Sequence, residues 1–317
     1  MDNKATREVV NYFFKMHGIS SKTCCEPHEK CQREAIRAHS IPSSTVLSHL
    51  ARDGHVVMLQ MRLKLPPPAE ISFQPVGINK ATTFTGLCDQ HDNAIFRPID
   101  DSLPNTHDPE HLFLLAYRAV LREYHVVLQN AIRFQATYKK RVEVGLSPSD
   151  VPCNFGMFAL SHIMNALECY EYKRQYDNAY LQQRWHELHH EVLVLHDQPP
   201  SIAVSSMFSL DDVPAPETPR VTLSVFPINN AVVIVFSATQ SDTPFVSPYL
   251  SRIVAAESHY QKYLLSKLIL QSCDNFVIAP HYFDAMPQTQ KDVIGQFYTD
   301  TILKNAEDYE DEKLLLF

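Results

Sequence analysis

The spacing of apolar residues predicts two long helices in the middle of the chain. The first covers residues 108–142 and begins at Asp108-Pro109-Glu110, where the aspartate can cap the helix and the proline suits its first turn. The second covers residues 154–196, after a turn that contains glycine and proline. Two long helices joined by a short turn usually pack antiparallel, so the pattern predicts a helical hairpin.

Shorter apolar runs on either side of this hairpin predict a sheet and its covering helices. Three runs rich in valine, isoleucine and phenylalanine predict an antiparallel meander, over residues 202–210, 221–226 and 231–237. The other expected elements are helices at 9–16, 248–272 and 287–304 and strands at 55–59, 61–65 and 276–279. Pro66-Pro67-Pro68 marks a loop, because proline cannot donate to a sheet ladder.

Composition and charge narrow the classes of function. The chain has 317 residues, 45% hydrophobic and 20% charged, which is typical of a soluble globular protein with two or three domains. The net charge of −8 disfavours a general nucleic-acid binder, although residues 1–65 hold ten Lys or Arg against six Asp or Glu. Arg118 and Arg122, one turn apart in the first long helix, are interpreted as a surface or ion-paired group rather than a phosphate site.

Targeting signals are not evident in the sequence. The first residues lack the pattern of a signal peptide, and no run of 18 apolar residues occurs. We therefore expect a cytoplasmic protein without a membrane span. The sequence does not specify its oligomeric state.

Cysteine and histidine side chains form two dense groups in the first hundred residues. Seven cysteines in a chain without a secretion signal favour metal binding over disulfides. Zinc takes four sulfur or nitrogen ligands in a tetrahedron, commonly as two close pairs, and the spacing of Cys88 and His91 suits such a pair. The predicted structural zinc site consists of Cys25, Cys31, Cys88 and His91. Cys24 and His28 are alternatives for the first ligand.

Short motifs around these ligands resemble those of a family of uncharacterised bacterial proteins. The matching motifs are Ala38-His39-Ser40-Ile41-Pro42, Gly54-His55-Val56, Ala81-Thr82-Thr83-Phe84, Gly86-Leu87-Cys88, His91-Asp92 and Phe96-x-Pro98-Ile99. The resemblance continues through residues 112–118 and, weakly, into the C-terminal half.

The same arrangement resembles, more distantly, the treble-clef zinc finger of HNH endonucleases. In that superfamily a zinc-binding loop precedes a strand with a catalytic histidine, and a later Leu-Cys-x2-Cys/His motif opens the helix that completes the zinc site. The resemblance implies that His39 is a general base for water and that Asp92 helps to hold a catalytic Mg²⁺ or Mn²⁺. The sequence departs from the pattern where Thr83 replaces an asparagine and where Asp92 replaces a histidine or asparagine.

A second metal-binding motif, His-Glu-Leu-His-His, lies at residues 186–190 within the second predicted helix. On a helix, His186 and His190 would share one face and could bind zinc, as in zinc proteases. Arg184 and Glu191 place charges on both sides of the motif, and no clear third ligand follows. We interpret it as a solvent-exposed or helix-packing cluster.

These observations predict an α+β protein with three consecutive domains. Residues 1–107 form the zinc module of HNH-like, treble-clef type, residues 108–198 the helical hairpin, and residues 199–317 an antiparallel sheet with helices. The first functional hypothesis is a metal-dependent HNH-like nuclease that acts on nucleic acid in bacterial defence against phage. The second is a non-catalytic, zinc-stabilised scaffold or sensor that binds a protein or small ligand, and the third is the zinc protease.

Overall fold

The computed structural model of the chain describes residues 3–62, 70–303 and 311–317. Helices and strands are mixed along the chain, and the strands of its seven-stranded sheet pair antiparallel, which confirms the α+β class. The predicted Pro66-Pro67-Pro68 loop lies outside the described residues, as do the ends of the predicted strand 61–65 and helix 287–304.

The elements have the following bounds. The helices are α1 Asn3–His17, α2 Ser48–Leu50, α3 Asp89–Asp100, α4 Pro109–Glu143, α5 Asn154–Leu181, α6 Thr243–Val254, α7 Ser258–Ser272, α8 Pro280–Ala285 and α9 Gln288–Tyr298, with π-helical turns at Ser43–Leu47 and Thr299–Leu303 and a 3₁₀ turn at Trp185–Glu187. The strands are β1 Ala38–His39, β2 His55–Arg62, β3 Glu70–Gly77, β4 Thr83–Phe84, β5 Leu188–His196, β6 Ile202–Ser209, β7 Arg220–Ile228, β8 Ala231–Thr239 and β9 Phe276–Ile278.

The chain forms two compact units, and neither is a continuous stretch. The first unit comprises Met1–Ala38, Phe84–Ala94 and Val120–Arg184, and the second comprises His39–Thr83, Ile95–Ala119 and Trp185–Phe317. Each unit therefore takes residues from more than one of the three consecutive segments predicted from the sequence. Helices α3 and α4 each contribute residues to both units.

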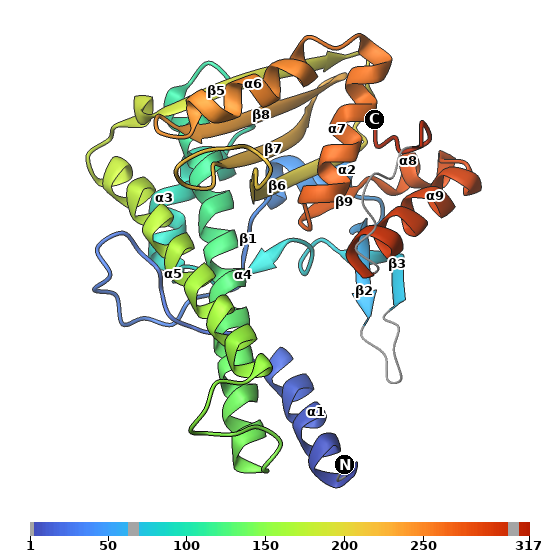
Figure 1. Cartoon of the computed structure of the whole chain (residues 1–317). Coiled ribbons are helices and arrows are strands. Elements are labelled where there is room, and N and C mark those ends of the chain that lie inside the picture. The colour runs from blue at the N-terminus through green and yellow to red at the C-terminus, as the bar shows by residue number, and fades with distance from the viewer. Residues whose placement is uncertain (1–2, 63–69, 304–310) are drawn as a thin grey trace. The chain divides into compact units, whose positions relative to one another are not determined.

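In the first unit, α5 and the later part of α4 pack antiparallel, as the sequence predicted (Figure 1). The ring of Tyr124 lies 5.8 Å from that of Tyr170, and the ring of Phe134 stacks on His162 at 4.3 Å. Residues later in α4 therefore lie opposite residues earlier in α5, which means that the two helices run in opposite directions. The hairpin begins where the sequence predicts, because α4 starts at Pro109. The side chain of the preceding residue, Asp108, accepts a hydrogen bond from the backbone N–H of Glu110 at 2.9 Å and so caps the helix.

The second long helix is shorter in the structure than the predicted range of residues 154–196. Helix α5 ends at Leu181, after which Gln183 has a positive φ of 53°, and residues 188–196 form strand β5 instead of helix. Strand β5 pairs along its whole length with β8, from Leu188 opposite Thr239 to His196 opposite Ala231. This pairing with a distant segment outweighs the local helical pattern.

The second unit is built on a seven-stranded sheet of order β3-β2-β9-β6-β7-β8-β5. Strands β6, β7 and β8 form the predicted meander, and the short strand β9 lies between β6 and β2. Helices α6 and α7 lie across one face of the sheet (Figure 1), and α9 joins them in one apolar core with the sheet. The predicted helix 248–272 is divided into α6 and α7, because Glu257 is extended at ψ 151°.

Helix α4 begins in the second unit, where residues 112–119 are all buried. Arg118 is among them, and its guanidinium forms two hydrogen bonds to the carboxylate of Asp100, at 2.7 and 2.6 Å. The same guanidinium lies 4.1 Å from the centre of the Phe96 ring. Arg118 is thus ion-paired, in line with the sequence interpretation.

Candidate metal centre

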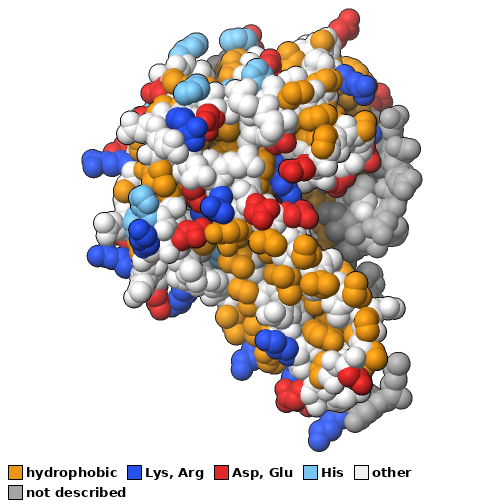
Figure 2. All heavy atoms as spheres, turned by 60° about the vertical axis from the view of Figure 1, so that its left-hand side comes forward, with side chains coloured by type: hydrophobic (Ala, Val, Ile, Leu, Met, Phe, Trp, Pro, Cys, Tyr) orange, Lys and Arg blue, Asp and Glu red, His pale blue; other side chains and the backbone are white. Residues whose placement is uncertain are grey.

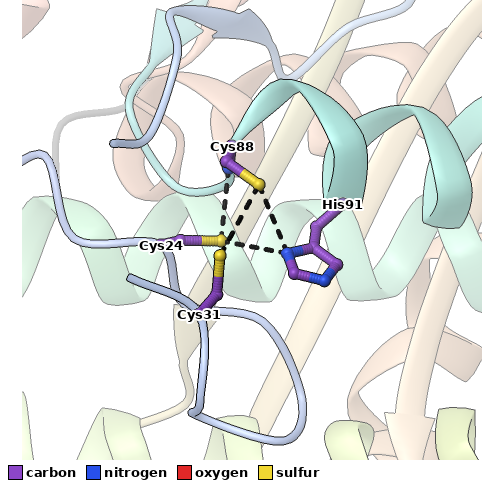
Figure 3. A group of neighbouring side chains, drawn as sticks. All are labelled: Cys24, Cys31, Cys88 and His91. Atoms are coloured by element: carbon purple, nitrogen blue, oxygen red, sulfur yellow. Dashed lines mark hydrogen bonds between the residues drawn. The ribbon is translucent and has the colours of Figure 1, made fainter. Parts of the chain in front are cut away.

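Four side chains of the first unit converge on one point, namely Cys24, Cys31, Cys88 and His91 (Figure 3). Their ligand atoms all lie within 4.8 Å of one another. The Sγ atoms of Cys31 and Cys88 are 3.8 Å apart, and Nδ1 of His91 lies 3.3 Å from Sγ of Cys88 and 3.5 Å from Sγ of Cys24. With Zn–S bonds of about 2.3 Å and Zn–N bonds of about 2.0 Å, a tetrahedral zinc separates its ligand atoms by about 3.5 to 3.8 Å. The donor set and its spacing therefore fit one zinc ion.

One ligand pair comes from the start of helix α3. Cys88 directly precedes the helix and His91 lies in its first turn, so both side chains project from the same end. The carbonyl of Cys88 accepts a hydrogen bond from the N–H of Asp92 at 2.9 Å, which is the first turn of the helix. Burial raises the pKa of the Cys88 thiol, but hydrogen bonds from the His91 backbone and from the other cysteines lower that pKa by more. Cys88 therefore ionises more readily than an ordinary cysteine.

The other pair comes from the loop between Cys24 and Cys31, and Glu26 organises this loop. The Glu26 side chain is only 3% exposed, and its carboxylate accepts hydrogen bonds from the N–H groups of His28, Lys30 and Cys31 at 2.7, 2.6 and 3.1 Å. Burial raises the pKa of Glu26, but these bonds outweigh it and leave the pKa below its usual value. Sequence analysis missed Glu26, because a glutamate between two cysteines gives no sign that it is buried.

Backbone N–H groups point at two of the ligand sulfurs. The N–H of Cys88 donates to Sγ of Cys24 at 3.2 Å, and the N–H of Arg33 donates to Sγ of Cys31 at 3.4 Å. Such bonds stabilise thiolates, which are the form of cysteine that binds a metal. Without a metal, burial raises the pKa of the Cys24 thiol to about 12.

Cys24 occupies the place that the sequence analysis gave to Cys25. The Cys25 thiol donates to the carbonyl of Thr23 at 3.6 Å, and its backbone N–H donates to the carbonyl of Gly86 at 2.8 Å. Successive side chains of an extended segment point to opposite sides, so only one of two adjacent cysteines can face the centre. The sequence alternative His28 lies outside the group, and Cys31, Cys88 and His91 lie in it.

The two residues predicted to be catalytic belong to different units. His39 is half-buried on β1 in the second unit, and its Nε2 lies 2.8 Å from the carbonyl oxygen of Ile78. Since a carbonyl only accepts, Nε2 carries the proton and donates this hydrogen bond. Asp92 follows the ligand His91 in the first turn of α3, in the first unit.

The His-Glu-Leu-His-His motif is not on a helix, which corrects the sequence analysis. His186 lies in a 3₁₀ turn and His190 in strand β5. Nδ1 of His190 and Oγ of Ser237 are 2.8 Å apart, and burial lowers the pKa of His190 to about 4. The single helical face that would present both histidines to one zinc ion is therefore not formed.

Comparisons with protein-family models, with curated proteins and with solved structures find no match to this chain. Among the described residues, no helix combines the length and the apolar composition that a membrane span requires. The metal centre is thus the feature on which a functional proposal can rest.

Proposed function

We propose that the protein binds one structural zinc ion through Cys24, Cys31, Cys88 and His91. The spacing of the four ligand atoms, between 3.3 and 3.8 Å where pairs are in contact, carries this proposal. Four protein ligands complete a tetrahedron and leave no position for water or substrate, which is the arrangement of structural rather than catalytic zinc sites. The ion would tie the Cys24–Cys31 loop to the start of α3.

The order of elements around this centre supports a treble-clef module of HNH-like type. The ligand loop is followed by β1, β1 pairs with β4, and α3 then supplies the second ligand pair. The chain between β1 and β4 is long and contains β2 and β3, which form part of the large sheet. In this proposal an insertion separates two neighbouring strands of the zinc module.

Elemental analysis of protein purified without added metal tests the zinc proposal. We expect close to one zinc per chain, and we expect Cys88→Ser to lose the metal and to melt at a lower temperature, since structural zinc contributes directly to folding. Cys153→Ser is the matched control, because Cys153 lies outside the ligand group. Protein that contains no zinc and does not gain stability when zinc is added would contradict the proposal.

A second candidate function, metal-dependent cleavage of nucleic acid, is favoured by the hydrogen bond between His39 and Ile78. Because Nε2 of His39 donates to the Ile78 carbonyl, the neutral form of the ring has Nδ1 as its unprotonated nitrogen. A histidine held in this way suits a general base that takes a proton from an attacking water. Mg²⁺ or Mn²⁺ would supply charge neutralisation at the phosphate. A role in defence against phage remains a prediction.

Cleavage assays on DNA and RNA with added Mg²⁺ or Mn²⁺ test the second candidate. We expect cleavage that EDTA stops and that His39→Ala abolishes, with zinc content and melting temperature close to those of the unaltered protein. His49→Ala, which changes an exposed histidine of the same unit, should leave cleavage intact. Absence of cleavage with either ion would favour the non-catalytic, zinc-stabilised scaffold or sensor.

A further inference from the structure

The outward side of helix α5 carries a row of exposed apolar side chains, hereafter the α5 row. It consists of Met157, Leu160, Met164 and Leu167, each between 46% and 56% exposed. Their spacing of three, four and three residues places them on one stripe of the helix, as in the seam of a coiled coil. Figure 2 shows an apolar area on the side of the molecule where the helical hairpin comes forward.

The opposite side of α5 is already used for packing within the first unit. His162 stacks on Phe134 of α4, and Ala159, Ala166 and Cys169 are buried. A helix at the surface of a protein usually has one apolar side and one polar side, but this part of α5 is apolar on both. A contiguous apolar area that remains exposed is typical of an interaction surface.

We propose that the α5 row pairs antiparallel with the α5 row of a second copy of this chain. The spacing of three, four and three residues reads the same in both directions, so the row is complementary to itself about a two-fold axis. In this register Met157 lies opposite Leu167 of the second copy, and Leu160 lies opposite Met164 of the second copy. Each layer of the seam then holds one methionine and one leucine, which keeps its volume constant.

The charges beyond the α5 row favour the antiparallel direction. The same register places the exposed Arg174 beyond the N-terminus of the second copy's α5, toward the segment that carries the exposed Asp150. It also places Glu171 beside the N-terminus of the second copy's α5, where the helix dipole is positive. A parallel pairing would instead put Glu171 against Glu171 and Arg174 against Arg174, which is unfavourable.

The area of this surface suits a weak dimer. Val151, 55% exposed in the turn before α5, adds apolar surface at the N-terminal end of the row. Five half-exposed large side chains would bury about 400 Å² per copy, or about 800 Å² in total, which is the size of a weak, transient interface. We therefore expect association in the micromolar range.

Sedimentation equilibrium of the full chain, under reducing conditions and with zinc, tests the proposal. Between about 1 µM and about 1 mM we expect a reversible monomer–dimer equilibrium. Met164→Lys should weaken it at least about tenfold without lowering the melting temperature, because Met164 is exposed. Tyr260→Lys, which changes a residue 57% exposed on α7, should leave the equilibrium unchanged.

A charge exchange tests the direction of pairing. Arg174→Glu should weaken the dimer, and the double variant Arg174→Glu with Asp150→Lys should restore it, because the pair is re-formed with opposite signs. A protein that stays monomeric over the whole range would overturn the proposal. So would a dimer that is insensitive to Met164→Lys, or a double variant that dimerises no better than Arg174→Glu alone.

Discussion

The backbone N–H of Cys88 donates a hydrogen bond to the Sγ atom of Cys24 across 64 residues of chain, at 3.2 Å. This bond joins the ligand loop to the start of α3 before any metal is considered. The two adjacent cysteines differ in role, because Cys25 lies outside the group of four and its thiol hydrogen-bonds to the Thr23 carbonyl instead.

Cys24→Ser and Cys25→Ser form the most direct comparison. Cys24→Ser should lower zinc affinity at least about 100-fold and lower the melting temperature, because serine is a poor zinc ligand and folding depends on the bound ion. Cys25→Ser should keep one zinc per chain and should change the melting temperature far less. Zinc content by elemental analysis and affinity by competition with a chelator are the measurements. Loss of zinc in Cys25→Ser alone would restore the ligand set predicted from the sequence.

Glu26→Gln should destabilise the ligand loop without removing a ligand. The carboxylate accepts three backbone hydrogen bonds while almost fully buried, and a neutral amide accepts them less strongly, so we expect a loss of about 1 to 3 kcal/mol in the free energy of unfolding. Glu34→Gln is the control, because its ion pair with Lys22 is exposed and is worth about 1 kcal/mol or less. Denaturant unfolding of both variants gives the two values, and equal losses would contradict the prediction.

The stability contributed by Glu26 should depend on pH in one direction. Its pKa in the folded protein is lower than in the unfolded chain, so this stability is present above about pH 4.5. It is lost as the pH falls through the lower pKa of the folded state. Unfolding measured against pH should therefore show a smaller decrease on the acid side in Glu26→Gln than in the unaltered protein.

His190 should make the second unit lose stability at a higher pH than the pH at which the contribution of Glu26 is lost. Its pKa falls to about 4 in the fold from 6.5, so the unfolded chain takes up a proton first as the pH decreases. The free energy of unfolding should decrease by about 3 kcal/mol between pH 6.5 and pH 4 through this residue. His190→Gln should flatten that decrease, whereas His189→Gln, on the exposed side of the same strand, should not. Identical pH profiles for the two variants would argue against a half-buried, neutral His190.

Asp100→Asn should cost far more stability than Asp101→Asn next to it. Asp100 pairs with Arg118, whose side chain is 2% exposed, so its neutralisation leaves a buried guanidinium without its counter-charge and costs about 2 to 4 kcal/mol. Asp101 pairs with Arg97, which is 77% exposed, and such pairs contribute at most about 1 kcal/mol. Thermal or denaturant unfolding measures both losses. A small decrease in the free energy of unfolding of Asp100→Asn would mean that the contact with the Phe96 ring is enough to stabilise the buried Arg118 guanidinium.

The sequence by itself determined the features that depend on neighbouring residues. Asp108 and Pro109 begin α4 through a local hydrogen bond and a fixed backbone angle, and the apolar runs between turn residues give β6, β7 and β8. The spacing of Cys88 and His91 predicted that they lie together in one candidate metal group, because both lie on a single turn of chain. These signals act within a few residues, so they can be seen without the fold.

Only the tertiary structure decided the features that depend on distant contacts. Strand β5 is a strand because β8 offers it a full ladder of hydrogen bonds, although its own sequence also suits a helix. Cys24 rather than Cys25 faces the centre because Cys88 donates to its sulfur from 64 residues away, and Glu26 is buried because the loop closes around it. The free energy of each choice comes from groups far apart in the chain, and their positions are fixed only when the whole chain has folded.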